Sequence, residues 1–277
     1  MQELKALVRA ALAEDIGQGD ITTNATIRPD SRCQAWLIAK QDGILSSTKA
    51  FRAVFDCLDA DIHDWKAIHD GASFERGDRL IEFQGWTAPI LTGERVALNF
   101  IQHLTGIATF AGEFRKAVEG LPVRLCDTRK TTPLLRKLEK EAVVHGGCTN
   151  HRYALFDGVL IKENHITGAG GIRPALERAI KGTHHLMKVG IEVTNIDELH
   201  EAIAGGADAV LLDNMSVEMI GEAVKICEDA NVVVEASGNI TMENVRAVAE
   251  AGVHLISIGA LTHSAPAVDL SLIIKNV

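Results

Sequence analysis

Residues 186–214 read LMKVGIEVTNIDELHEAIAGGADAVLLDN, and the pattern in this stretch decides the fold. An apolar run at 186–191 is followed by polar residues, by a helical pattern that closes at glycine, and by a second apolar run at 209–212. Short apolar runs rich in β-branched residues are typical of buried strands, and the pattern between them is typical of an amphipathic helix. The stretch therefore predicts a strand, a helix and a second strand parallel to the first.

The same order of elements repeats from about residue 122 to residue 258. The predicted strands are residues 123–126, 158–161, 186–191, 209–212, 232–234 and 255–258. Parallel strands alternating with helices fit either an open doubly wound sheet or a closed barrel. Polar residues follow each strand and can meet at one mouth, as they do in barrels, so a barrel is favoured. Six strands are fewer than eight, so the fold class is predicted as α/β with an incomplete, open parallel barrel.

Residues before about Gly106 follow a different pattern. Segments 33–46 and 71–85 each read as two strands joined at a turn, Asp42-Gly43 in the first and Gly77-Asp78 in the second. Helices are predicted at residues 2–14, 49–58 and 93–104, and alternating apolar residues at 268–274 predict a last strand. The predicted domains are residues 1–106, joined by a returning strand at 267–277, and a barrel domain at 107–266.

Composition limits the classes of partner. The chain has 277 residues, a formal net charge of −9 and a pI near 5.7. Nucleic acid and anionic membranes require an extended basic face, so neither is expected as a partner. No run is long and apolar enough to span a bilayer, and charges interrupt the N-terminal apolar residues, unlike a signal peptide. The five cysteines form no CxxC pair, as in reduced proteins, and a cytoplasmic location is expected.

Positive charge gathers in one stretch although the whole chain is acidic. Residues 124–165 hold eight Lys or Arg against five Asp or Glu. The cations that follow predicted strands or lie near glycine-rich turns are Arg129, Lys130, Arg152 and Lys162, with His151 beside them. Guanidinium forks and ammonium charges in such a group suit carboxylates held in a fixed orientation. The alternative for any single cation is a surface ion pair with a carboxylate of the same stretch, such as Glu139, Glu141 or Glu163.

Carboxylates and glycine-rich turns follow the later strands. Glu192 ends the pattern VGIE, and Asp213 ends the pattern LLD. Two such carboxylates can hold Mg²⁺ through its water shell or accept hydrogen bonds from ribose hydroxyls; alternatively, each simply caps the next helix. The last two turns contain Ser237, Gly238, Gly259 and His263, and backbone N–H groups at this position of a barrel bind phosphate. The alternative for Gly238 and for Gly259 is that the turn only requires the backbone freedom of glycine.

Helix signals accompany the strands. Thr132 and Pro133 predict the start of a helix with Leu134 on its apolar face and its end at Gly146-Gly147, and Thr241 predicts a helix over 242–251. Arg95, Asn99 and His103 recur at four-residue spacing, which by pattern alone predicts a solvated helix face.

Seven fragments in fixed order carry a resemblance that runs nearly end to end. They are GDITT (19–23), ERVALNF (94–100), DTRKTTP (127–133), GGCTNHR (146–152), LIKENH (160–165), EASGNI (235–240) and GALTHSAP (259–266). Together they resemble the quinolinate phosphoribosyltransferases, also called carboxylating nicotinate-nucleotide pyrophosphorylases. Cys148 departs from a third glycine usual in the family, and Leu134 departs from a frequent glycine, without removing a charged group.

The resemblance implies an N-terminal α/β sandwich domain, a C-terminal incomplete barrel, and a homodimer whose sites are shared between subunits. It implies conversion of quinolinate and phosphoribosyl pyrophosphate to nicotinate mononucleotide, pyrophosphate and CO₂ with Mg²⁺, a step of NAD biosynthesis.

The resemblance also implies residue roles. The quinolinate carboxylates would be bound by Arg129, His151, Arg152 and Lys162, with Arg95 from the partner subunit. Lys130, Glu192 and Asp213 would serve phosphoribosyl pyrophosphate and Mg²⁺. The 5′-phosphate would be bound by Ser237, Gly238, Gly259 and His263. Catalysis would rest on Lys130, Lys162, Glu192 and Asp213.

Three other functions compete with this one. A related phosphoribosyltransferase-like protein encoded with molybdate transport systems would take a different substrate. A barrel aldolase would use Lys130 or Lys162 as a Schiff base, which requires a desolvated lysine. A binding protein would hold the dicarboxylate without turnover.

Overall fold

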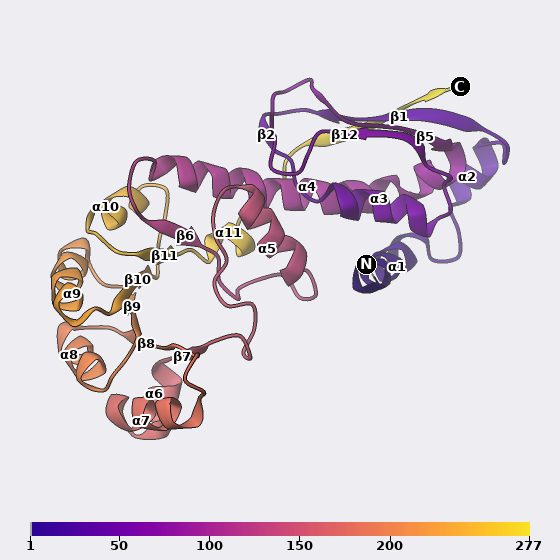
Figure 1. Ribbon diagram of the computed structural model, residues 1–277. Coiled ribbons are helices and arrows are strands. Elements are labelled where there is room, and N and C mark those ends of the chain that lie inside the picture. Colours follow the sequence, from indigo (N-terminus) through magenta and orange to yellow (C-terminus); the bar gives the residue numbers. More distant parts are fainter. Residues whose placement is uncertain (1) are drawn as a thin grey trace. The chain divides into compact units, whose positions relative to one another are not determined.

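The protein's structure, a computed structural model, describes residues 2–277 and divides them into two compact units. The N-terminal unit comprises residues up to Gly112, Thr132–Gly147 and Ala265–Val277. The C-terminal unit comprises Glu113–Thr131 and Cys148–Ser264. Figure 1 labels the helices and strands of both.

An antiparallel sheet forms the centre of the N-terminal unit. Its four strands follow the order β12-β1-β5-β3. The strands are β1 (Arg32–Ala39), β3 (His63–Ala67), β5 (Arg79–Trp86) and β12 (Leu270–Asn276). Burial alternates strictly along β1, because successive side chains point to opposite faces of a strand. The buried face packs with Phe51, Phe55 and Phe83, whose rings contact one another.

Among the described helices of this unit, two begin and end within two residues of the prediction, two differ from it, and one was not predicted. The helices are α1 (Gln2–Ile16), α2 (Ile21–Thr26), α3 (Thr48–Cys57), α4 (Thr87–Ala117) and α5 (Arg136–His145). The prediction for α4, residues 93–104, was too short, and Gly106 and Gly112 lie beyond its predicted end. In the structure both glycines lie inside the helix and permit close packing. A Cβ on Gly106 would lie 2.1 Å from the Pro266 carbonyl oxygen, and one on Gly112 would lie 2.4 Å from Ile44 Cδ1.

The two predicted hairpins were wrong in their pairing. The short strands β2 (Gly43–Ile44) and β4 (Ser73–Phe74) pair with each other in a separate sheet, while β1 pairs with β5. Backbone hydrogen bonds join Ala39, at the end of β1, to Asp78 and Gly77, and the Arg76 backbone N–H donates to Asp42 Oδ1, so the two turns lie against each other. The turn residues were recognised correctly, but the partner of each strand is set by the tertiary fold.

The start of α5 was also predicted wrongly. The helix begins at Arg136, and the turn before it places Leu134 at φ 67° with its side chain 88% exposed. A residue in this left-handed conformation cannot continue a right-handed helix, so Thr132 does not cap it. The predicted end is confirmed, with Gly146 as the C-cap and Gly147 at φ 85°.

Six parallel strands form the C-terminal unit in the order β6-β11-β10-β9-β8-β7. They are β6 (Arg124–Cys126), β7 (Val159–Ile161), β8 (Val189–Val193), β9 (Ala209–Asp213), β10 (Val233–Ser237) and β11 (Leu255–Ser257). Every predicted strand of this unit is present. Within the described residues β6 and β7 form the two edges and do not pair, which confirms the open, incomplete barrel and the α/β class.

Helices connect these strands and cover the outside of the curved sheet, as α8, α9 and α10 show in Figure 1. They are α6 (Glu163–Ala169), α7 (Ile172–Gly182), α8 (Ile196–Ala204), α9 (Val217–Ala230), α10 (Val245–Glu250) and α11 (Ala260–His263). The predicted helix at 242–251 starts later, at Val245 with Asn244 as its N-cap, and the Asn244 side chain accepts from the Thr241 backbone N–H. None of the helices in residues 2–277 is both long and apolar enough to cross a membrane.

Strand register stacks polar side chains in two layers on the inner face. Asp213, Ser237 and Ser257 are neighbours across β9, β10 and β11. One layer lower, Glu192 and Glu235 flank Leu211 on either side of β9. Because side chains alternate along a strand, both layers point the same way, and the register thus fixes the polar floor of the site.

Candidate active site

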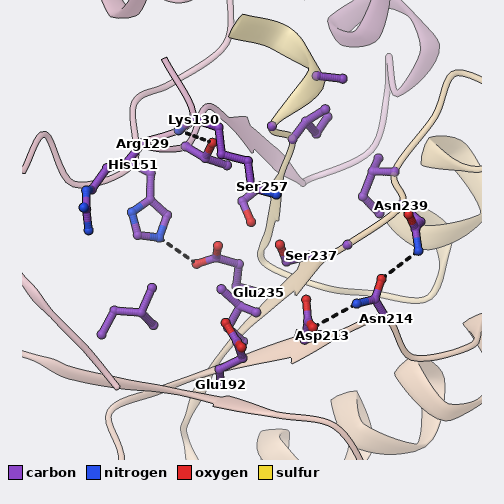
Figure 2. A pocket seen from close by; sticks show the side chains of 18 of the residues that line it. Arg129, Lys130, His151, Glu192, Asp213, Asn214, Glu235, Ser237, Asn239 and Ser257 are labelled. Carbon is purple, nitrogen blue, oxygen red and sulfur yellow. Dashed lines mark hydrogen bonds and ion pairs between the residues drawn. The ribbon is translucent and has the colours of Figure 1, made fainter. Parts of the chain in front are cut away.

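A pocket of about 880 Å³ opens at the carboxyl ends of the parallel strands, and its lining comes entirely from the C-terminal unit. This is where barrels place their active sites, and the volume suits two small substrates. Figure 2 shows cationic, carboxylate and amide side chains around it. Its polar and glycine lining is Thr128, Arg129, Lys130, His151, Arg152, Lys162, Glu192, Asp213, Asn214, Glu235, Ser237, Gly238, Asn239, Thr241, Ser257, Gly259 and His263.

The cations approach from two loops and one strand end. Arg129 and Lys130 follow β6, and Arg152 lies in the loop before β7, where its Nη1 donates to the Gly158 carbonyl at 2.7 Å. Burial lowers the pKa of Arg152, and the charge of Arg129 lowers it further. Two guanidinium groups are thus held close enough to repel each other. That cost is offset when an anion binds between them.

Lys162 follows β7 and forms an ion pair with Glu192 at the end of β8. Glu192 is only 13% exposed, whereas Lys162 is 47% exposed. The lysine therefore neutralises a largely buried carboxylate while its own charge still faces the pocket. The alternative considered for each cation was a surface ion pair with Glu139, Glu141 or Glu163. Lys162 pairs with Glu192 instead, and Glu141 pairs with Lys49 in the N-terminal unit.

A chain of amides orients the second carboxylate. Asn239 Nδ2 donates to Asn214 Oδ1 at 2.9 Å, and Asn214 Nδ2 donates to Asp213 Oδ2 at 2.8 Å (Figure 2). Both asparagines have positive φ, a conformation that asparagine tolerates better than most residues. Gly238 between them is required, since a Cβ there would lie 2.3 Å from Asn214 Oδ1. The Asp213 carboxylate is therefore fixed in direction.

The last turn of the sheet brings backbone and cations together. A Cβ on Gly259 would lie 3.0 Å from Lys130 Cδ and 3.1 Å from His263 Nε2, so the glycine lets both side chains approach the turn. Thr262 Oγ1 donates to the Lys130 carbonyl at 2.7 Å and fixes the loop after β6. A turn with a lysine and a histidine beside its backbone suits a phosphate.

His151 is held by its backbone and its ring. Its backbone N–H donates to Asp127 Oδ1 at 2.9 Å, and Asp127 is fully buried. Ring atom Nδ1 accepts from the Arg152 backbone N–H at 2.7 Å, and Nε2 lies 3.4 Å from Glu235 Oε2. The loop that carries His151 and Arg152 is thereby tied to β6 and β10.

The structure gathers nearly every residue that the sequence proposed for the site. Those lining the pocket are Arg129, Lys130, His151, Arg152, Lys162, Glu192, Asp213, Ser237, Gly238, Gly259 and His263. Arg95 does not line it; it is exposed on α4 in the N-terminal unit. Asn214, Glu235 and Asn239 also line the pocket and were not predicted as site residues, although all three stand in the quoted sequence fragments.

The structure also shows the surroundings of Cys148 and His103. Cys148 is buried, and burial raises the pKa of its thiol to about 12, so it is not a nucleophile. Gly147 takes the left-handed conformation in that turn, and Cys148 is not among the residues with positive φ, so its side chain fits. His103 is not simply solvated, because its Nε2 hydrogen bonds to the buried Glu139 at 2.8 Å.

Known protein families match this sequence over most of the chain. Residues 107–273 match the family described as Quinolinate phosphoribosyl transferase, C-terminal domain, and residues 20–105 match its N-terminal domain. The chain belongs to the quinolinate phosphoribosyltransferase family. The predicted family is thereby confirmed.

Individual relatives cover nearly the full length. A probable carboxylating nicotinate-nucleotide pyrophosphorylase of Bacillus subtilis is 40% identical over 98% of this chain and 93% of its own. The structure of the nicotinate-nucleotide pyrophosphorylase from Francisella tularensis superposes with a TM-score of 0.92 at 41% identity, covering 99% of this chain and 96% of that chain. That of Ehrlichia chaffeensis gives a TM-score of 0.92 at 36% identity, over 98% of each chain. The family's fold is present.

Proposed function

We propose that the protein is a quinolinate phosphoribosyltransferase that makes nicotinate mononucleotide, pyrophosphate and CO₂ for NAD biosynthesis. The observation that carries this is the division of one pocket into two halves. In one half, Arg129, Arg152 and Lys162 supply positive charge. In the other half, Glu192 and Asp213 lie at the ends of β8 and β9, near the glycine turns at 238 and 259. The first half suits a planar dicarboxylate, and the second suits a phosphorylated sugar.

The residues supply orientation and charge complementarity. Departure of pyrophosphate from C1 of the sugar builds positive charge on the ring, which Glu192 and Asp213 stabilise. The pyridine nitrogen then bonds to C1. Loss of CO₂ from the carboxylate beside that nitrogen leaves an electron pair that the positively charged ring stabilises until a proton replaces it. We propose no covalent intermediate with the protein, because the lysines of the pocket lie among ion pairs and anion-binding groups.

Mg²⁺ is proposed as the cofactor, and the donor set fits it. Within residues 2–277 no three His, Cys, Asp or Glu side chains group as ligands, which argues against a closed metal site. Mg²⁺ typically keeps several waters and takes one or two carboxylates together with substrate phosphates. Glu192 and Asp213 would hold it through water, and the ion would neutralise the leaving pyrophosphate.

A homodimer in the cytoplasm completes the proposal. Arg95 is exposed on α4 and outside the pocket of its own C-terminal unit, in accord with a role toward a partner subunit's substrate. The five cysteines are thiols, as expected in a reducing compartment. Analytical ultracentrifugation should show a dimer, and mixing Arg95→Ala subunits with subunits inactivated at Lys130 should restore activity if sites are shared.

An assay with quinolinate, phosphoribosyl pyrophosphate and Mg²⁺ tests the main proposal. Stoichiometric release of CO₂ and formation of nicotinate mononucleotide are expected, with nicotinate in place of quinolinate as the control. Turnover of nicotinate but not of quinolinate would overturn it. A different substrate, as in the relative encoded with molybdate transport systems, would show as no turnover of either pyridine.

The aldolase alternative is tested separately. A Schiff base needs a lysine without its proton, whereas Lys162 is paired with Glu192. Borohydride with a carbonyl substrate should therefore leave the protein's mass unchanged. A covalent adduct on Lys130 or Lys162 would favour the aldolase, and tight quinolinate binding without turnover would favour a binding protein.

A further inference from the structure

Glu235 stands in the pocket without a role in the proposal above. It lies on β10 in the lower polar layer, opposite Leu211, and its side chain is 12% exposed. Oε2 faces His151 Nε2 at 3.4 Å, while Oε1 is buried without a hydrogen-bond partner (Figure 2). A carboxylate in a pocket for anions repels the substrate, and its burial has a further cost. Its presence therefore requires a compensating interaction.

The ring of His151 shows what that interaction is. Nδ1 accepts the Arg152 backbone N–H at 2.7 Å, so this nitrogen carries no proton. The proton of the neutral ring then lies on Nε2, the atom that faces the Glu235 carboxylate. A donor N–H and an acceptor carboxylate are thus opposed, and the ring is held at both nitrogens.

The arrangement has a counterpart across Leu211. Glu192 and Glu235 occupy equivalent register positions on the strands either side of β9. Glu192 holds Lys162 on one side of the pocket, and Glu235 faces His151 on the other. Each buried carboxylate therefore fixes one group that faces the substrate.

We infer that Glu235 is a positioning residue, which accepts the His151 Nε2–H and so holds the ring in one tautomer and one orientation beside the dicarboxylate substrate. The inference rests on the proposed function for the identity of that substrate. The tautomer and orientation of the His151 ring are inferred from the structure and do not depend on the proposed function.

Nitrogen-15 NMR of the intact protein tests the ring directly. Long-range ¹H–¹⁵N correlation spectra of histidine-labelled protein should show His151, assigned by the loss of its signals in His151→Gln, as the Nε2–H tautomer. A resolved Nε2–H proton that exchanges slowly with water is expected, because Glu235 holds it. An Nδ1–H tautomer would overturn the inference whatever the enzyme's substrate, and this measurement requires no variant of Glu235.

Two variants test the link to substrate. Glu235→Leu removes the acceptor at similar size and should raise KM for quinolinate by about tenfold to a hundredfold, with KM for phosphoribosyl pyrophosphate within about threefold. The slowly exchanging Nε2–H should disappear. Glu235→Gln keeps an acceptor oxygen and should restore both the Nε2–H signal and most of the quinolinate KM.

Three kinetic outcomes would contradict the inference. They are an unchanged quinolinate KM in Glu235→Leu, a rise only in the KM for phosphoribosyl pyrophosphate, and a failure of Glu235→Gln to rescue. Thermal unfolding of each variant establishes that it is folded. If the unsubstituted protein does not turn over quinolinate, the proposed function fails, while the NMR result still decides the state of the ring.

Discussion

Each unit of the molecule holds a histidine paired with a glutamate, and the two pairs are completed differently. In the N-terminal unit, Glu139 is fully buried, with one oxygen 2.8 Å from His103 Nε2 and the other accepting the Thr132 backbone N–H at 3.1 Å. In the C-terminal unit, Glu235 lies 3.4 Å from His151 and leaves one buried oxygen without a partner. The first pair is satisfied within the fold, and the second lies in a pocket.

The difference distinguishes charged groups that stabilise the fold from charged groups that are available to bind a ligand. A buried carboxylate with every acceptor used contributes to the free energy of folding, because losing a partner leaves a desolvated group. A carboxylate or cation at the mouth of a parallel sheet keeps unused bonding capacity, which is available to a ligand. Substitutions in the two units should accordingly change different measured quantities.

The largest expected effect is in the pocket. Arg152→Ala should raise KM for quinolinate by about tenfold to a thousandfold, because a charge-assisted contact to a carboxylate is lost. Arg152→Lys should recover only part of it, since a single ammonium does not replace a planar fork. The matched control is Arg124→Ala, an exposed arginine that starts β6 at the opposite end of the sheet. Steady-state kinetics of the three variants measure this, and unchanged kinetics in Arg152→Ala would remove that residue from the site.

Loss of the buried Glu139–His103 pair should lower the stability of the protein. Glu139→Ala should lower the free energy of unfolding by about 3 kcal/mol, because His103 and the Thr132 N–H lose their acceptor inside the fold. Glu141→Ala, two residues along the same helix, removes only the partly exposed pair with Lys49 and should cost less than about 1 kcal/mol. Urea unfolding gives both values. A quinolinate KM that rises in Glu139→Ala as far as in Arg152→Ala would break the distinction between the two units.

A smaller gain is expected from Leu134→Gly. Leu134 sits at φ 67° and is 88% exposed, so its side chain contributes strain without packing. Glycine removes about 1–2 kcal/mol of strain and costs about 0.5–1 kcal/mol through the greater entropy of the unfolded chain, for a net stabilisation of up to about 1.5 kcal/mol. Leu135→Gly is the control, because Leu135 has φ −93° and should be destabilised by the same change. A destabilised Leu134→Gly protein would show that the leucine makes a contact outside the described chain.

The smallest effect concerns pH. Asp20 caps α2, and the side-chain hydrogen bond from Thr23 lowers its pKa, with backbone Thr23 N–H and Thr92 adding to it. Because the native pKa is lowered, this contribution to stability is present above the unfolded value, near pH 4, and is lost as pH falls through the native value. Asp20→Ala should cost about 1 kcal/mol at neutral pH. The difference in unfolding free energy should shrink below pH 4, and a difference independent of pH would mean that the carboxylate charge is not involved.

The sequence alone was sufficient for the parallel sheet and for most of the site. Alternation of apolar runs with glycine-closed helices defines local units, and the polar residues after each run must gather at the carboxyl edge once the strands lie parallel. For this reason the sequence predicts the positions of Arg129, Lys162, Glu192 and Asp213 at one edge of the sheet. Some strand partners and helix ends in the N-terminal unit were not predicted correctly. The partners of β2 and β4, the length of α4 and the start of α5 depended on contacts between distant residues, which local patterns do not encode.

Tertiary structure also decided which charges are free to bind. By pattern, Glu139 and Glu235 are both carboxylates in charged fragments, and His103 and His151 are both histidines near them. Only the folded chain shows that one pair has its oxygens satisfied and the other has an oxygen left over beside a cavity. The reason is physical. Residue type and spacing set what a side chain can donate or accept, whereas desolvation and unmet bonding capacity exist only after distant segments have packed around it.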